Sequence, residues 1–121
     1  MANKVLIVDD DNRNIFALKA VLKAKGYQCL SAPGAEEGIH MLANNPEIGV
    51  VLMDMMMPGM DGYEAMAKMN SDPVLKHIPV IAVTAQAMLG DRERCLEAGA
   101  VGYVSKPINV EELTKLLTEY V

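Results

Sequence analysis

A chain of 121 residues has room for one domain, and we expect residues 1–121 to form a single unit with its own core. The net charge of −5, with only three arginines, argues against direct binding to nucleic acid, which requires a basic surface. No apolar run approaches the roughly 20 residues that span a bilayer, and no secretory signal pattern opens the chain, so we expect a cytoplasmic protein without membrane partners.

Apolar runs and helical segments alternate along the chain. A continuous β-branched run predicts a strand buried on both faces, and apolar residues every three or four positions predict a helix. In chain order we expect a strand at Lys4–Val8, a helix from about Asn12 to Lys25, a strand at Tyr27–Ser31, a helix at Ala35–Ala43 and a strand at Gly49–Met53. A helix at Gly62–Asn70, a strand at Val80–Thr84, a helix at Leu89–Ala98, a strand at Gly102–Ser105 and a helix from Asn109 towards Tyr120 follow. Strict alternation predicts an α/β fold of parallel strands joined by right-handed crossovers.

Polar residues stand where the predicted strands end. Asp9 and Asp10 follow the first strand, Asp54 follows the third, Thr84 closes the fourth and Lys106 follows the fifth. Ligands of open parallel sheets bind outside the carboxyl ends of the strands, so these side chains should converge there. Each residue alone has a simpler explanation, such as a helix cap or a solvated turn. Their origin in four separate strands favours a common site.

The charges of these residues indicate a metal. Asp9, Asp10 and Asp54 together carry −3 when ionised, and a divalent cation with the Lys106 ammonium would bring the sum to zero. Oxygen ligands select a hard ion, and we expect Mg²⁺. Metal and lysine play this neutralising role in phosphoryl-transfer centres, where a carboxylate can be the covalent acceptor. Asp54 is the best acceptor candidate, because it is central and follows the most buried strand.

Competing motifs are missing from the sequence. The chain has no Gly-Lys-Ser/Thr phosphate loop, no Gly-x-Gly-x-x-Gly after the first strand, and no Asp-x-Asp at Asp54. His40 and His77 stand alone, so we do not expect histidine-based catalysis. Cys29 and Cys95 have no metal-binding spacing and are expected to be reduced.

The sequence resembles the receiver domains of two-component response regulators. The matching stretches are Val5–Asp10, Val51–Gly62, Val83–Ala85 and Tyr103–Pro107, and the resemblance extends over essentially the whole chain. It implies a flavodoxin-like, doubly wound sheet of five parallel strands in the order 2-1-3-4-5, with five helices.

The resemblance also implies roles for the converging residues. Asp54 would accept a phosphoryl group from a histidine kinase or a histidine phosphotransfer protein, which makes the chain a phosphorelay signalling domain and not a turnover enzyme. Asp10, Asp54 and the backbone carbonyl of Met56 would bind Mg²⁺, with Asp9 acting through water. Lys106 would hold the phosphoryl oxygens.

The switch implied by the resemblance involves Thr84 and Tyr103. Thr84 would move towards the phosphoryl group and Tyr103 would swing inward, altering the fourth helix, fifth strand and fifth helix for a downstream protein. The peptide before Pro107 is cis in many members. Met56 and Gln86 occupy positions that tune the phosphoryl lifetime in the family, and they depart from its pattern.

Other interpretations stay open on the residues alone. A flavodoxin-like FMN domain would share the fold, but this chain has an acidic triplet after the first strand, no Trp and one Phe. The receiver could also belong to a hybrid histidine kinase, although the absence of a DNA-binding segment before Val121 favours a single-domain regulator. We expect a kinase to dock near Ile15, Phe16 and Lys19, and we favour a core position for Phe16.

Overall fold

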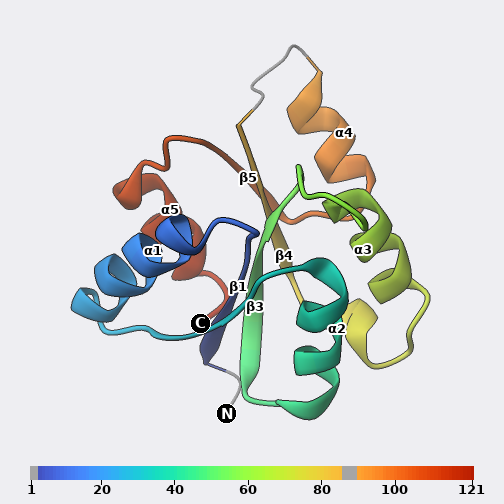
Figure 1. Cartoon of the computed structure of the whole chain (residues 1–121), viewed down its shortest axis with the longest axis horizontal. Helices are drawn as coiled ribbons and strands as arrows, with labels where there is room; N and C mark the ends of the chain where they lie inside the picture. The colour runs from blue at the N-terminus through green and yellow to red at the C-terminus, as the bar shows by residue number, and fades with distance from the viewer. Residues whose placement is uncertain (1–2, 86–89) are drawn as a thin grey trace.

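Residues 3–85 and 90–121, which the computed structural model describes, form a parallel five-stranded sheet with helices on both faces (Figure 1). The elements are β1 (Lys4–Val8), α1 (Asn12–Ala24), β2 (Gln28–Ala32), α2 (Ala35–Asn44), β3 (Ile48–Asp54), α3 (Gly62–Asn70), η1 (Leu75–His77), β4 (Val80–Thr84), α4 (Asp91–Glu97), β5 (Gly102–Ser105) and α5 (Val110–Leu117). The strands lie in the order β2-β1-β3-β4-β5, so the predicted doubly wound α/β fold is confirmed. None of the described helices is long and apolar enough to cross a membrane.

The predicted boundaries hold best where the chain carries a strong local signal. The bounds of β1, α3, β4 and β5 are as expected, β2 is displaced by one residue, and β3 continues to include Asp54. The short 3₁₀ turn η1 was missed, because three residues are too few to show a helical period. Leu89, the expected start of the fourth helix, and Gln86 lie outside the described residues, and α4 begins at Asp91.

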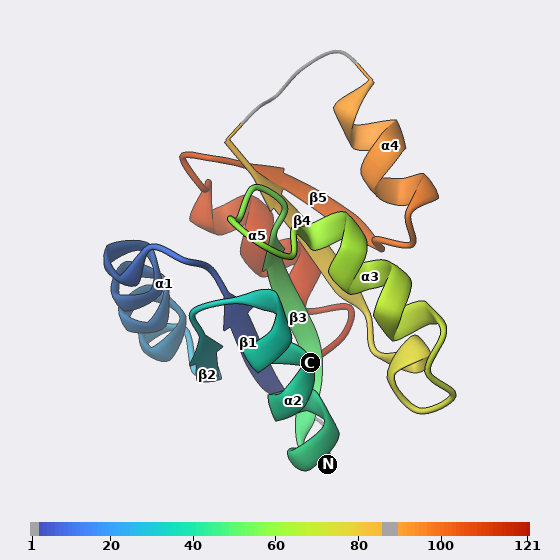
Figure 2. The ribbon, with the colours of Figure 1, turned by 45° about the vertical axis from the view of Figure 1, so that its right-hand side comes forward.

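The central strands are mostly apolar, since helices cover both faces of the sheet. Helices α1 and α5 lie on one face, and α2, α3 and α4 lie on the other (Figures 1 and 2). In β1, Val5 and Ile7 pack in the cluster on the α1 and α5 side, whereas Leu6 and Val8 pack in the opposite cluster. The two-residue period of a strand divides each run between the two cores. This packing fixes the positions of the strand ends, where the polar residues lie.

Side-chain caps begin three of the helices. Asp11 accepts a hydrogen bond from the Arg13 backbone amide at the start of α1. Asp61 caps α3 in the same way, and Asn109, the expected start of the last helix, accepts from the Glu112 amide at α5. Each cap directs the chain from a strand end into the following helix.

The favoured core position of Phe16 was wrong. Phe16 is 76% exposed, whereas its neighbour Ile15 is buried. Ile15, Leu18 and Leu22 share the buried face of the helix. One residue turns the helix by about 100°, which carries Phe16 away from the sheet.

Gly62 gives a test of how tightly β3 is joined to α3. A Cβ at this position would lie 2.5 Å from Met55 Sδ and 3.0 Å from the Asp54 carbonyl oxygen, with the backbone unable to yield without moving the strand end. Gly62→Ala should lower the free energy of unfolding by about 1–3 kcal/mol in urea denaturation. Lys68→Ala, at an exposed position of α3, is the control and should change it by less than about 0.5 kcal/mol. Equal stabilities of the two variants would contradict this packing.

Candidate functional site

The carboxyl ends of β1 and β3 bring three aspartates together. Oxygens of Asp9, Asp10 and Asp54 all lie within 4.8 Å of one another, and no other cluster of this kind exists within residues 3–85 and 90–121. Asp9 is 3% exposed and Asp54 is 4% exposed, whereas Asp10 is open to solvent. The residues meet because β1 pairs directly with β3 at the centre of the sheet. A set of hard oxygen donors with one open side fits a hydrated Mg²⁺ ion.

Lys106 links the two buried carboxylates. Its Nζ lies 3.2 Å from Asp9 Oδ2 and 3.3 Å from Asp54 Oδ2. The residue follows β5, and its backbone amide donates to the Thr84 carbonyl at 2.7 Å, which holds the start of this loop beside β4. The Lys106–Pro107 peptide is cis, as the resemblance implied. The predicted convergence of the fifth strand end on the acidic cluster is therefore confirmed.

Backbone amides orient the other oxygen of each buried carboxylate. The Asp11 amide donates to Asp9 Oδ1 at 2.8 Å, and the Met56 amide donates to Asp54 Oδ1 at 2.9 Å. Sequence reasoning missed both donors. Both could have been found from the sequence. In each case an aspartate at a strand end stands two residues before the donating amide, which is the spacing of an Asx turn. Both oxygens of Asp9 and of Asp54 are thus held in place.

The electrostatics of the site follow from its burial. Burial raises the pKa of the Asp54 carboxyl, and the Asp9 charge adds to this, while the Met56 amide and Lys106 only partly oppose it. Burial on its own would lower the pKa of the Lys106 ammonium, but Asp54 and Asp9 outweigh it, so that pKa is raised. The lysine is therefore a permanent cation between two carboxylates.

The two expected switch residues, Thr84 and Tyr103, differ in burial and in contacts. Thr84 is 2% exposed at the end of β4, in register with Ser105. Tyr103 is half-buried, and its hydroxyl donates to Asp91 Oδ2 at 3.0 Å, a contact with α4 that the sequence did not indicate.

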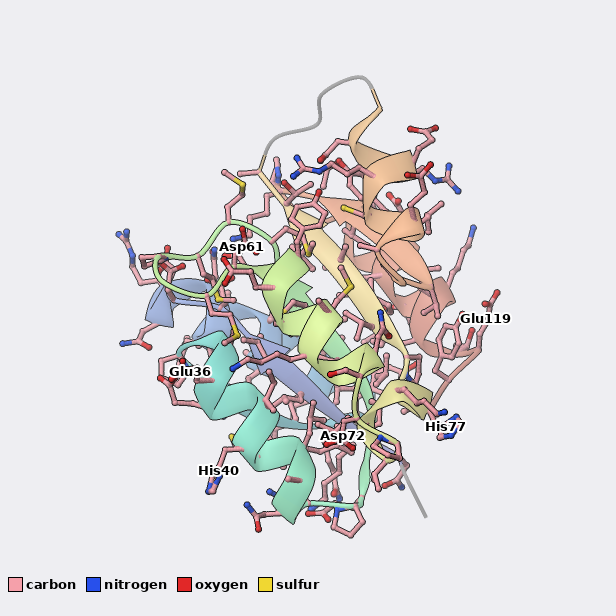
Figure 3. All side chains as sticks on the ribbon, turned by 90° about the vertical axis from the view of Figure 1, so that its right-hand side faces the viewer. Glu36, His40, Asp61, Asp72, His77 and Glu119 are labelled. Atoms are coloured by element: carbon pink, nitrogen blue, oxygen red, sulfur yellow. The ribbon has the colours of Figure 1, made fainter. Side chains whose placement is uncertain are left out.

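The histidines and cysteines take no part in the cluster. Figure 3 shows His40 and His77 towards the opposite end of the molecule from Asp61, which lies in the loop before α3. Cys29 and Cys95 are free, as expected.

Comparison with known proteins identifies the family. Residues 5–118 match the model of the response regulator receiver domain. The chain belongs to this family. It is therefore a receiver domain of two-component phosphorelay signalling, and the FMN alternative is set aside.

Individual relatives agree with this assignment. The chain is 40% identical over 110 residues to the response regulator PleD of Caulobacter vibrioides and spans 24% of that protein. It is 36% identical to the polar-differentiation response regulator DivK of Brucella ovis, covering 99% of this chain and 97% of DivK. Among solved structures it resembles the receiver domain of a Pseudomonas aeruginosa sensor histidine kinase that holds a magnesium ion in its active-site cleft, with a TM-score of 0.86, 31% identity and coverage of 99% and 98%.

Asp54→Asn is expected to stabilise the metal-free protein at neutral pH. Because the folded-state pKa of Asp54 is raised, ionisation is less favourable in the folded chain, and the free energy of unfolding falls as the pH rises through that pKa. The amide removes this penalty. The melting temperature in EDTA should therefore rise by a few degrees, with a gain that shrinks as the pH approaches 3.8, the ordinary value.

The control for this measurement is Glu119→Gln, an exposed change just after α5 (Figure 3). It removes one negative charge far from the aspartates and should show no comparable gain. A melting temperature of Asp54→Asn at or below that of wild type near neutral pH would contradict the raised pKa.

Proposed function

We propose that Asp54 is the residue that accepts a phosphoryl group from a phosphohistidine, and that the domain uses this modification as a conformational switch. The observation that carries the proposal is the placement of Asp54, which is 4% exposed at the end of the central strand β3 with Lys106 Nζ 3.3 Å from its carboxylate. A buried nucleophile beside a fixed cation is the arrangement that phosphoryl transfer requires.

The proposed reaction needs no further nucleophile. A carboxylate oxygen of Asp54 attacks phosphorus, an O–P bond forms, the N–P bond of the phosphohistidine breaks, and the electron pair returns to the imidazole nitrogen. Lys106 offsets the charge of the phosphoryl oxygens. Slow attack of water on the same phosphorus releases inorganic phosphate and restores the carboxylate. The protein is thus modified and reset, and does not turn over an external substrate.

Mg²⁺ is the proposed cofactor. Asp10 and Asp54 would hold it directly, with the backbone carbonyl of Met56, and Asp9 would act through water. The bound ion supplies positive charge that neutralises the phosphoryl oxygens during transfer. The clustered carboxylate oxygens and the magnesium ion in the related Pseudomonas receiver support this assignment.

The proposed readout surface is formed by α4, β5 and α5. Thr84 and Tyr103 would carry the change from the phosphorylated aspartate to this surface. A groove of about 570 Å³ lies there, and it is lined by Arg92, Leu96, Val101, Gly102, Tyr103, Glu112, Lys115 and Leu116. Its mixture of apolar and charged side chains suits a protein segment. We propose a downstream protein as the partner, no direct nucleic-acid contact, and a cytoplasmic location for residues 1–121 acting as one unit.

The phosphoryl donor is proposed to dock between α1 and the loop after β5. A groove of about 250 Å³ separates them, lined by Asn14, Ala17, Leu18, Val21, Lys106, Pro107, Ile108 and Val110. Lys106 belongs both to this groove and to the acidic cluster, so a partner seated here reaches the acceptor. Phe16 is not among the lining residues, but it is 76% exposed on the same helix, and we propose that it is an additional aromatic contact for the partner outside the groove. A histidine kinase or a histidine phosphotransfer protein fits this position.

Acetyl phosphate with Mg²⁺ should add one phosphoryl mass to the wild-type protein, measured by intact-mass spectrometry. The adduct should be labile to hydroxylamine, as an acyl phosphate is, and absent in EDTA. Asp54→Asn should abolish it, whereas Glu119→Gln, an exposed change of equal charge, should leave it in place. The same adduct on Asp54→Asn would overturn the assignment of the acceptor.

Phe16→Ala should slow transfer from the cognate phosphorylated kinase by about tenfold or more, because exposed aromatic anchors dominate small interfaces. The cognate kinase is first found by profiling transfer from the organism's purified kinases. Acetyl phosphate should modify the variant at the wild-type rate, since the small donor needs no docking surface. Val74→Ala is the matched control, because Val74 is 72% exposed near η1, away from this groove. Unchanged kinase transfer to Phe16→Ala would place the docking surface elsewhere.

A further inference from the structure

Asp91 joins two tyrosines from different elements. The carboxylate belongs to the first residue of α4 and is partly buried. Its Oδ2 accepts a hydrogen bond from the Tyr103 hydroxyl on β5 at 3.0 Å, and its Oδ1 accepts a longer one from the Tyr63 hydroxyl on α3 at 3.4 Å. Asp91 lies outside the acidic cluster, and the proposed chemistry at Asp54 gives it no part.

Tyr63 holds α4 in place on α3. The guanidinium carbon of Arg94 lies 4.3 Å from the centre of the Tyr63 ring, and the Tyr63 hydroxyl is 3.4 Å from Cys95 Sγ, which is fully buried. Asp91, Arg94 and Cys95 share one face of α4, since residues three and four apart on a helix are neighbours. Figure 2 shows α4 beside α3 and β5. The helix is thus fixed on its α3 side by several contacts.

On the β5 side, Tyr103 donates the one side-chain hydrogen bond that joins β5 to α4 among the described residues. Burial, with the Asp91 carboxylate next in importance, raises the pKa of Tyr103 to about 12, so its hydroxyl stays protonated and able to donate at neutral pH. A hydrogen bond to a charged acceptor is among the stronger ones in proteins. Any movement of the Tyr103 ring that withdraws its hydroxyl from α4 must break this bond, whereas the Tyr63 contacts can persist.

We propose that Asp91 is a positioning residue that holds Tyr103 against α4 and thereby sets the equilibrium of the switch. The inference rests on the proposed function, because it concerns the inward movement of Tyr103 that phosphorylation at Asp54 would favour. In the unphosphorylated domain the Asp91 carboxylate stabilises the half-buried position of the ring. The inward position lacks this bond, so removal of the carboxylate shifts the population inward before any phosphorylation.

The test follows Tyr103 directly in Asp91→Ala and Asp91→Asn. The protein is labelled with 3-fluorotyrosine, and the four ¹⁹F resonances are assigned by single Tyr→Phe changes. Wild type with Mg²⁺ and beryllofluoride defines the switched position of the Tyr103 resonance. Without beryllofluoride, the Asp91→Ala resonance should move towards that position, corresponding to an equilibrium constant raised roughly tenfold. Asp91→Asn keeps a neutral acceptor and should give a smaller shift.

Controls separate this role from a structural one. Glu93→Ala removes an exposed acid from the same helix and should leave the Tyr103 resonance at its wild-type position. Acetyl phosphate should modify Asp91→Ala faster than wild type, because a preformed switched state favours the modified form. On a Tyr103→Phe background, Asp91→Ala should cause no further change in this rate. Thermal melts and circular dichroism check that each variant folds.

The outcomes distinguish a failure of the switch from a failure of the positioning role of Asp91. If beryllofluoride does not move the Tyr103 resonance in wild type, or wild type is not phosphorylated, the proposed switch itself is wrong. If wild type responds but folded Asp91→Ala keeps the wild-type resonance and rate, the positioning role is overturned. An equal effect of Asp91→Ala with and without the Tyr103 hydroxyl would also overturn it, since the carboxylate would then act by another route.

Discussion

The contact of one ammonium with two buried carboxylates is the interaction on which the rest of this structure depends. Lys106 reaches Asp9 and Asp54 at 3.2 Å and 3.3 Å, while Asp10 brings a third acidic group within the same 4.8 Å cluster. One cation cannot balance three carboxylates, so the site favours further positive charge. Repulsion among the carboxylates also opposes formation of the site. The packing of the central strands on both faces of the sheet must therefore hold the three groups together.

This imbalance explains why the site lies at the centre of the sheet. β1 and β3 are neighbours, and their alternate residues are anchored in two separate cores, so neither strand end can move away to relieve repulsion. Backbone amides at Asp11 and Met56 then fix the direction of each buried carboxylate. The raised pKa of Asp54 shows that its ionised form is disfavoured in this buried, acidic site. In our proposal this unfavourable electrostatic free energy drives function, because metal binding and phosphorylation both reduce it.

In the proposed mechanism, β4 and β5 connect the site to the surface. The Lys106 amide is bonded to the Thr84 carbonyl, which ties the end of β4 to the loop after β5. On the adjoining surface, Tyr103 of β5 is bonded to Asp91 of α4. In our proposal, a change at the aspartates reaches α4 through these contacts. In the proposed mechanism, the balance between the Tyr103–Asp91 bond and the phosphorylated site decides which state predominates.

Much of this protein was determined by the sequence alone, because its strongest signals are local. Uninterrupted apolar runs indicated strands buried on both faces. The polar residues at or just after the ends of these runs were therefore expected to be neighbours, namely Asp9, Asp10, Asp54, Thr84 and Lys106. The position of Phe16 was misjudged, because the face of α1 that meets the sheet depends on how the helix packs and not on its composition. The amides that orient Asp9 and Asp54 have a local signal in the Asx-turn spacing at each strand end, whereas the contacts of the Asp91 carboxylate with Tyr63 and Tyr103 were decided only by the tertiary structure. Such contacts join residues through space at a particular angle, and no spacing along the chain encodes that angle.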